Sequence, residues 1–219
     1  LGKLPVDNWY VGLYGQDSWR VSSRVTLNYG MRWEPYFGQN VRNGVISVFN
    51  MDNFTKNVQS KVFLKAPAGV LYAGDTGFPN NKKTGMNKQW WNLSPRGGFA
   101  WDVHGDGRLA VRSSYAMAYD FMAGEYHNID ANAPPFGNRS FLTSVPFDDP
   151  YQGHDPHPVV TNANTDYVPF GTFGTMDPAI NSPRVQSWNA SVEKQIGASW
   201  SFSVAYLGSH SDRLWAQKA

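Results

Sequence analysis

The strongest pattern in the chain is the alternation of apolar and polar residues between Arg20 and Glu34. Successive side chains of a β-strand point to opposite faces of a sheet, so this alternation predicts a strand with one apolar face and one polar face. An α-helix would spread the same apolar residues around its circumference, and we exclude a helix here. The apolar positions are Val25, Leu27, Tyr29, Met31 and Trp33, and the polar or small positions are Thr26, Asn28, Gly30, Arg32 and Glu34.

The same pattern predicts three hairpins, each with a short turn. The turns are residues 20–24, the glycine-rich Gly105-Asp106-Gly107, and Gly197-Ala198-Ser199. The expected fold is all-β: an antiparallel transmembrane β-barrel segment with strands near residues 8–19, 25–36, 93–103, 109–120, 185–196 and 200–209. On the later hairpins the apolar face is expected to carry Phe99, Trp101, Val111, Tyr115, Trp188, Val192, Trp200, Phe202 and Val204.

Two long segments, residues 37–91 and 121–183, separate the hairpins and are rich in Asn, Gly, Pro and Asp. Loops longer than about 12–15 residues are uncommon in compact soluble domains. Short turns on one side and long loops on the other are typical of outer-membrane barrels, whose short turns lie in the periplasm. We therefore expect two long extracellular loops. Short apolar runs at residues 45–49 and 62–64 are expected to extend barrel strands above the membrane as hairpins.

Aromatic residues on the apolar faces gather at the two ends of the predicted strands. Trp19, Trp101 and Trp200 lie beside the short turns, and Trp9, Trp33, Tyr119, Trp188 and Tyr206 lie at the opposite ends. Two aromatic belts around an apolar band are typical of membrane–water interfaces. On these faces only Asp17 and Lys194 are charged, and both are close to a short turn. The alternative is that the aromatics pack the core of a soluble sandwich.

Composition excludes several classes. Charged residues make up 16% and aromatics 15% of the 219 residues, and the net charge of +2 is not concentrated in a basic run, so we expect no nucleic-acid partner. The absence of cysteine excludes disulfides and thiol chemistry. No run of eighteen apolar residues exists, but a spanning β-strand needs only about 9–11 alternating residues. We expect the chain to be an internal part of a longer precursor.

A family resemblance rests on several motifs: Leu13–Arg20, Leu27–Glu34, Ser94–Asp102, Gly105–Arg108, Ala66–Gly77, Val185–Asn189 and Tyr206–His210. In order and spacing these motifs resemble the barrel of TonB-dependent outer-membrane receptors, in particular the Oar-like subgroup. The resemblance covers nearly the whole chain. It implies a 22-stranded barrel, an N-terminal plug and a segment energised by the inner-membrane TonB complex. Neither the plug nor that segment is recognisable here, so we interpret residues 1–219 as an internal fragment of one barrel domain.

Six charged residues fall on the predicted polar faces, where they would point into the barrel lumen: Arg32, Glu34, Arg96, Arg112, Asp120 and Glu193. They could line a path or contact a plug or ligand, or they could form a cross-strand network that satisfies a polar wall. Arg32 and Glu34 are expected near Arg96. Trp90 and Trp91 end the first long loop and could stack on a sugar or peptide ligand, or belong to the outer aromatic belt.

No catalytic or metal motif emerges. The segment from Asp102 resembles a calcium loop only weakly, because Ser113 stands where the bidentate glutamate would be. His154 and His157 lack a third histidine nearby. We expect no enzyme activity, no cofactor and no metal.

The leading hypothesis is a segment of a TonB-dependent transporter in the bacterial outer membrane that takes up an unidentified nutrient. Its partners would be outer-membrane lipid, the nutrient, and the TonB complex through parts outside this chain. The alternatives are an adhesin or structural barrel without transport, and a soluble carbohydrate-binding β-sandwich. Siderophore, saccharide, peptide and cobalamin-like ligands remain open.

Overall fold

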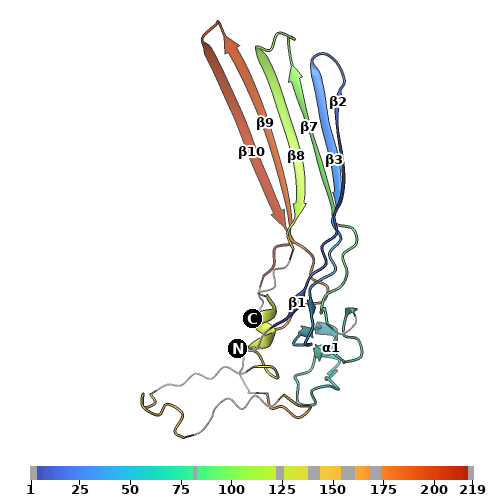
Figure 1. The fold of residues 1–219 in the computed structure, drawn as a ribbon, viewed down its shortest axis with the longest axis vertical. Helices are drawn as coiled ribbons and strands as arrows, with labels where there is room; N and C mark the ends of the chain where they lie inside the picture. Colours follow the sequence, from blue (N-terminus) through green and yellow to red (C-terminus); the bar gives the residue numbers. More distant parts are fainter. Residues whose placement is uncertain are drawn as a thin grey trace. The chain divides into compact units, whose positions relative to one another are not determined.

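The computed structural model describes residues 4–80, 83–121, 126–137, 144–153, 161–167 and 174–216 (Figure 1). The chain divides into two compact units. The sheet unit comprises Tyr10–Tyr36, Gln89–Phe121 and Asn181–Ala219, and the loop unit comprises Leu1–Trp9, Phe37–Lys88 and Met122–Ile180. The long segments predicted as loops therefore form a folded unit of their own, which the prediction of a single barrel domain did not include.

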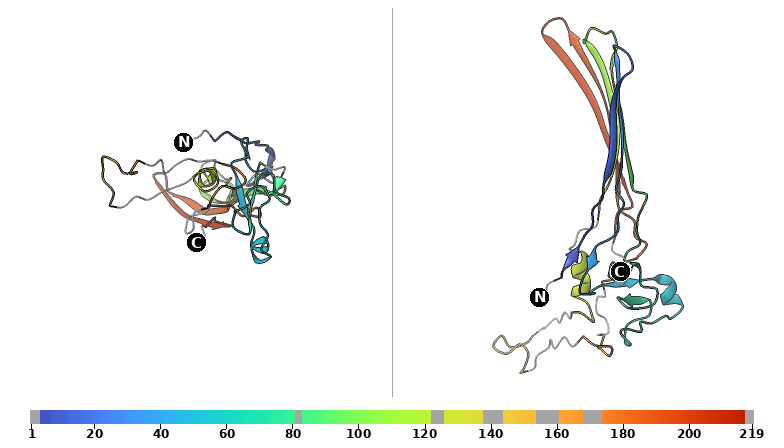
Figure 2. Two further views of the ribbon diagram at one scale, coloured as in Figure 1. Left: turned by 90° about the horizontal axis from the view of Figure 1, so that it is seen from below. Right: turned by 45° about the vertical axis from the view of Figure 1, so that its right-hand side comes forward.

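The sheet unit is a six-stranded antiparallel sheet with strand order β10-β9-β8-β7-β3-β2. Strands that follow one another within this unit pair as neighbours, and Figure 2 shows them twisting along the sheet. Within the described residues β2 and β10 are the edges, so the sheet does not close on itself. The all-β, antiparallel prediction is confirmed. The strands are β2 Leu13–Arg20, β3 Val25–Trp33, β7 Leu93–Asp102, β8 Leu109–Tyr119, β9 Arg184–Ile196 and β10 Trp200–Asp212.

The pairing register confirms the predicted faces. One row of directly paired residues crosses five strands: Val25, Trp101, Val111, Val192 and Val204. Directly paired residues share a face, so the predicted apolar side chains form one continuous apolar face, and the residues between them form the polar face. Phe99 and Phe202 on the apolar face remain 39% and 55% exposed. No second layer covers this face in the part of the chain described, so the sandwich alternative is wrong.

Strand ends differ from the prediction at three places. Residues 8–12 are not a strand, and β3 ends at Trp33 rather than at residue 36. Beyond β3, Glu34 N–H still donates to Asn92 O, and Tyr36 bridges Gln89. The β9–β10 hairpin instead extends to Asp212. This adds Arg184 and Asp212 to the charged residues of the apolar face, where the guanidinium donates from Nη2 to Asp212 Oδ2 at 2.5 Å.

Asp102 explains the motif at the β7–β8 turn. Its carboxylate accepts hydrogen bonds from the backbone N–H groups of Gly105 and Gly107, both at 2.9 Å. These glycines have φ values of 80° and 72°, which other residues rarely adopt. The acidic and glycine residues that weakly resembled a calcium loop therefore close a hairpin.

The loop unit contains short elements: β1 Val6–Asp7 pairs with β4 Asn40–Val41, and β5 Ser47–Phe49 pairs with β6 Val70–Tyr72. Its helices are α1 Met51–Thr55 and α2 His127–Ala131. No helix in the described ranges is long and apolar enough to cross a membrane. The prediction that residues 45–49 and 62–64 extend barrel strands is wrong, because β5 pairs with β6 and residues 62–64 form no strand.

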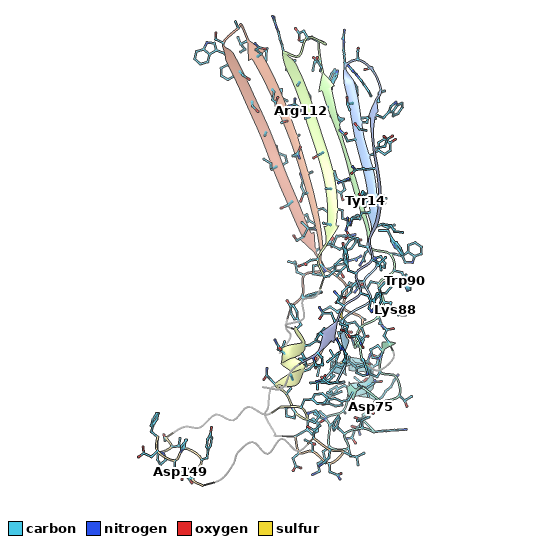
Figure 3. All side chains as sticks on the ribbon, viewed as in Figure 1. Tyr14, Asp75, Lys88, Trp90, Arg112 and Asp149 are labelled. Atoms are coloured by element: carbon cyan, nitrogen blue, oxygen red, sulfur yellow. The ribbon has the colours of Figure 1, made fainter. Side chains whose placement is uncertain are left out.

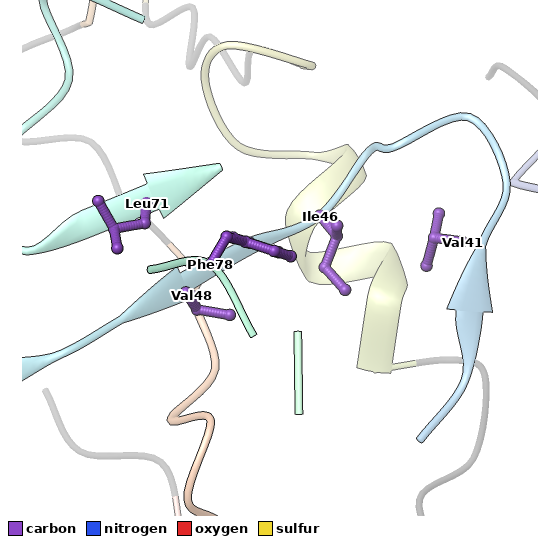
Figure 4. Packing of buried hydrophobic residues seen from close by; sticks show 5 residues of the cluster. All are labelled: Val41, Ile46, Val48, Leu71 and Phe78. Atoms are coloured by element: carbon purple, nitrogen blue, oxygen red, sulfur yellow. The ribbon is translucent and has the colours of Figure 1, made fainter. Parts of the chain in front are cut away.

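Two apolar clusters form the core of the loop unit. The first joins Leu71 and Phe78 to three residues of the preceding segment (Figure 4), and Leu4 and Val6 pack against it. The second joins both long segments: Phe63 and Tyr72 from the first contact Phe136 from the second, with ring centroids 5.8 Å apart in each case. Residues far apart in the sequence thus share one interior. The three other residues of the first cluster are Val41, Ile46 and Val48.

Asp75 of the loop unit (Figure 3) organises the turn at residues 60–62. Its buried carboxylate accepts hydrogen bonds from Ser60 Oγ at 2.6 Å and from the backbone N–H groups of Lys61, Val62 and Tyr72 at 2.7, 3.2 and 2.9 Å. Three of these donors precede β6 in the chain, and the fourth, Tyr72, is the last residue of β6. Four donors compensate the loss of water around one charged group.

Candidate functional site

A groove of about 730 Å³ lies on the polar face of the sheet unit. Its floor is β7, where Gly98 and Ala100 have little or no side chain. Because neighbouring strands carry longer polar residues, the missing side chains leave a hollow among hydrogen-bonding groups. The polar lining comes from β2, β3, β7, β8 and β9 and includes Gln16, Asn28, Arg96, Arg112, Ser114 and Asn189.

Arg96 lies beside Gly30 on the neighbouring strand β3, its directly paired residue. A Cβ atom on Gly30 would lie 3.1 Å from Arg96 Nε, so the glycine makes room for the guanidinium to lie across β3. Among the described residues, Arg96 has no ion-pair partner. The groove therefore contains one cation that is not neutralised by the described part of the chain.

Arg112 is neutralised by the strand next to it. Its Nη1 lies 2.5 Å from Glu193 Oε1, with the two side chains 50% and 43% exposed. An ion pair this exposed contributes at most about 1 kcal/mol to stability. Beside it, Asn189 Nδ2 donates to Ser114 Oγ at 2.7 Å. These contacts hold the side chains that line the groove in place while leaving them exposed.

Arg32 and Glu34 meet each other at the loop end of the sheet, with 2.8 Å between Nε and Oε1. The Tyr10 hydroxyl joins the pair: it accepts from Arg32 Nη2 at 2.6 Å and donates to Glu34 Oε1. The Tyr10 ring contacts the Phe121 ring edge-on. The Tyr36 ring stacks on the same Phe121 ring, with 5.1 Å between the centroids. Burial raises the pKa of Tyr36 to about 12.

Sequence reasoning missed Tyr10 as the partner of the Arg32–Glu34 pair. The alternation could have indicated it, because Tyr10 precedes Tyr14 by four residues and so falls on the same face. Tyr14 is the residue paired with Arg32. Asp120, the sixth predicted residue, follows β8, and its backbone N–H donates to Pro183 O. Its carboxylate forms no ion pair with the residues described. The structure therefore pairs four of the six predicted residues, Arg32 with Glu34 and Arg112 with Glu193, whereas the expected ion pair with Arg96 is not formed among the described residues.

Trp90, labelled in Figure 3, and Trp91 precede β7, which begins at Leu93. The indole Nε1 of Trp33, on the apolar face, donates to the Trp90 carbonyl at 2.6 Å. Trp91 is 81% exposed. The Trp90 backbone is therefore held by Trp33 at the end of the apolar face, while the Trp91 side chain remains exposed.

The described residues contain no group of three or more metal-ligating side chains. His154 and His157 lie outside the described residues. The chemistry of the polar groove is hydrogen bonding and charge pairing by guanidinium, amide and hydroxyl groups.

A family model described as "Outer membrane beta barrel domain" matches residues 3–219. The chain belongs to this family. Membership of this family assigns an environment to each face of the sheet. In an outer-membrane barrel the apolar face contacts lipid and the polar face lines the interior. Bacterial outer-membrane localisation follows from the family. No curated protein and no solved structure matches the chain.

Proposed function

We propose that this chain is a segment of the barrel wall of a TonB-dependent transporter of the Oar-like subgroup, which takes up a nutrient through the outer membrane. The observation that carries the proposal is the grooved interior face with Arg96 unpaired among the described residues. A barrel with only a structural role needs a satisfied polar wall, whereas a transport path needs groups left available to a moving partner. The resemblance of several strand motifs to that subgroup supports the same conclusion.

In this proposal each part of the chain has one task. The sheet unit supplies a wall whose backbone groups are paired between strands. The Arg32–Glu34 and Arg112–Glu193 pairs keep that wall polar without a strong net field. Arg96 contacts an anionic or hydrogen-bonding group of the plug or the nutrient. The loop unit provides the extracellular surface that captures the nutrient. Energy comes from the TonB complex, and we propose no catalytic step, cofactor or metal in this chain.

The test uses the full-length gene. A deletion strain is grown with iron–siderophore, oligosaccharide, peptide or cobalamin as the limiting nutrient, to find the class whose uptake is lost. Complementation with Arg96→Ala is expected to lower uptake about tenfold at an unchanged receptor level, as expected for the loss of one charge-assisted contact. Lys194→Ala on the lipid face is the matched control and should restore uptake fully. Undiminished uptake in the deletion strain for every nutrient, or in a strain without TonB, would refute transport.

A second candidate function is adhesion, favoured by the loop unit's own two-cluster core. A rigid, folded extracellular unit is a better binding surface for a macromolecule than flexible loops. Surface attachment lost on gene deletion, with uptake intact for every nutrient, would assign this function in place of transport.

Trp90 and Trp91 are proposed as platforms on which the nutrient stacks before entering the barrel. Changing both to Ala should weaken uptake at a constant amount of receptor in the membrane. Trp200→Ala, an exposed residue beside a short turn, is the control. A parallel fall in uptake and receptor amount would assign the two tryptophans to the outer aromatic belt.

A further inference from the structure

A second groove, of about 460 Å³, lies on the apolar face of the sheet. Its floor is formed by Gly97 of β7 and Ser113 of β8. The surrounding side chains are almost entirely carbon: Leu27, Tyr29, Phe99, Tyr115 and Trp188. This groove lies behind the polar one, because Gly97 and Gly98 are adjacent residues that face opposite sides of β7.

Hydrogen bonds tie the two tyrosines to strands other than β7. Tyr29 and Tyr115 are the residues paired directly with Gly97, one on each side. The Tyr29 hydroxyl donates to Asp17 Oδ2 on β2 at 3.0 Å. The Tyr115 hydroxyl donates to Gln186 Oε1 on β9 at 2.9 Å. Both hydroxyls are therefore anchored on the far side of their own strands, and Gly97 has no side chain to fill the space between them.

We propose that this groove binds the acyl chain of a membrane lipid. It opens on the face that contacts lipid in this family, so its occupant comes from the bilayer. The tyrosine hydroxyls already have partners, and the groove therefore presents a carbon surface to its occupant. A polypeptide strand could not add here, since β3, β7 and β8 are paired on both sides and their ladders are complete. An acyl chain needs no hydrogen bonds and fits an apolar groove.

Gly97→Leu tests the proposal because it fills the floor of the groove. A Cβ atom at Gly97 would meet only Asn28 O, at 3.9 Å, so the backbone tolerates the substitution. Gly15→Leu is the matched control: Gly15 is on the same face of β2, outside the groove, and a Cβ atom there has no neighbour within 4 Å. Ser113→Leu fills the same groove from β8 and serves if Gly97→Leu does not reach the membrane.

The measurement is native mass spectrometry of the full-length protein extracted in mild detergent, which counts retained lipid. Phosphatidylcholine spin-labelled on its acyl chain then reports the motionally restricted fraction in vesicles. Wild type and Gly15→Leu should retain lipid, and retention should fall about tenfold in Gly97→Leu. Equal retention in all three proteins, or none in wild type, would overturn the proposal. So would a dimer of the chain that Gly97→Leu dissociates. The result does not depend on transport, since the proposal rests on membrane location alone.

Discussion

The sheet unit and the loop unit place their apolar side chains in opposite ways. In the loop unit Ile46, Val48 and Tyr72 are buried, whereas in the sheet unit Trp200, Phe202 and Val204 are exposed. Apart from Tyr36, every buried aliphatic or aromatic residue in the described ranges belongs to the loop unit.

The difference teaches that one chain is built for two solvents. Water drives the apolar residues of the loop unit into a core, because burial removes apolar area from water. Lipid gives no such drive between apolar groups, and what it demands is that every backbone group is paired. Between its two edge strands, β2 and β10, the sheet meets that demand through its ladders, so the two units should respond to different kinds of substitution.

The largest expected effect is in the loop-unit core. Phe63→Ala removes a buried ring that contacts Tyr72 at a centroid distance of 4.8 Å, and it should destabilise the loop unit by about 3–5 kcal/mol. Hydrogen exchange of the full-length protein in detergent should accelerate in the loop unit and stay unchanged in β7 and β8. Phe147→Ala is the control: this ring is 98% exposed, and its loss should have no measurable effect. Equal acceleration in both units would contradict their independence.

The next largest effect is expected for a charge introduced on the lipid-facing side of the sheet unit. Val111→Arg places a charge on the lipid face, between Trp101 and Val192, and should cost about 2–4 kcal/mol in the membrane-inserted protein. Arg112→Ala, one residue along the same strand, removes only a half-exposed pair and should cost at most about 1 kcal/mol. Folding yield into lipid vesicles, read from heat-dependent gel mobility, separates the two. Equal losses would show that the faces are wrongly assigned.

A smaller effect is expected at Asp75. Asp75→Ala leaves donors of the 60–62 turn and Tyr72 unpaired, and should destabilise the loop unit by about 1–3 kcal/mol. The control is Asp166→Ala, which breaks an exposed ion pair with Lys65. Limited proteolysis should cut the first variant sooner and leave the second at the wild-type rate. A wild-type rate for Asp75→Ala would show that the turn holds without its carboxylate.

The smallest effect is a pH dependence. Burial raises the pKa of Asp130 above 3.8, although its Oδ1 accepts from Ser47 N–H at 3.1 Å and Ser47 Oγ at 2.6 Å. As pH rises through 3.8 the unfolded chain ionises first, so the loop unit loses stability until the raised pKa is passed.

Asp130→Asn keeps both Ser47 contacts through its amide oxygen and has no proton to lose. The variant should flatten the pH dependence, measured by hydrogen exchange of the loop unit after correction for intrinsic exchange rates. The exposed Asp148→Asn should leave the slope as in wild type. A slope that persists in Asp130→Asn would assign it to another group.

The sequence predicted the sheet far better than the loop unit. A period of two is a local signal, and it was enough to place Val25, Phe99, Val111 and Phe202 on one face. Strand ends were less certain, because residues 8–12 continue the alternation yet leave the sheet.

The loop unit has no such period, and its contacts join distant residues. Ser47 and Asp130 are 83 positions apart. At the candidate site, the charged residues of the interior face could be named from their position in the alternation. Which of them pair could not, since Arg112 meets Glu193 diagonally across two strands, and that contact depends on the register.

The contacts of Phe63 and Tyr72 with Phe136 place residues of both long segments in one core, so the two segments should evolve together. A chimera that takes only one of the two segments from a relative would pack core residues of one protein against core residues of another. Variation in the loop unit should therefore occur in both long segments together, and grafting the loop unit onto another barrel should succeed only when both segments are transferred.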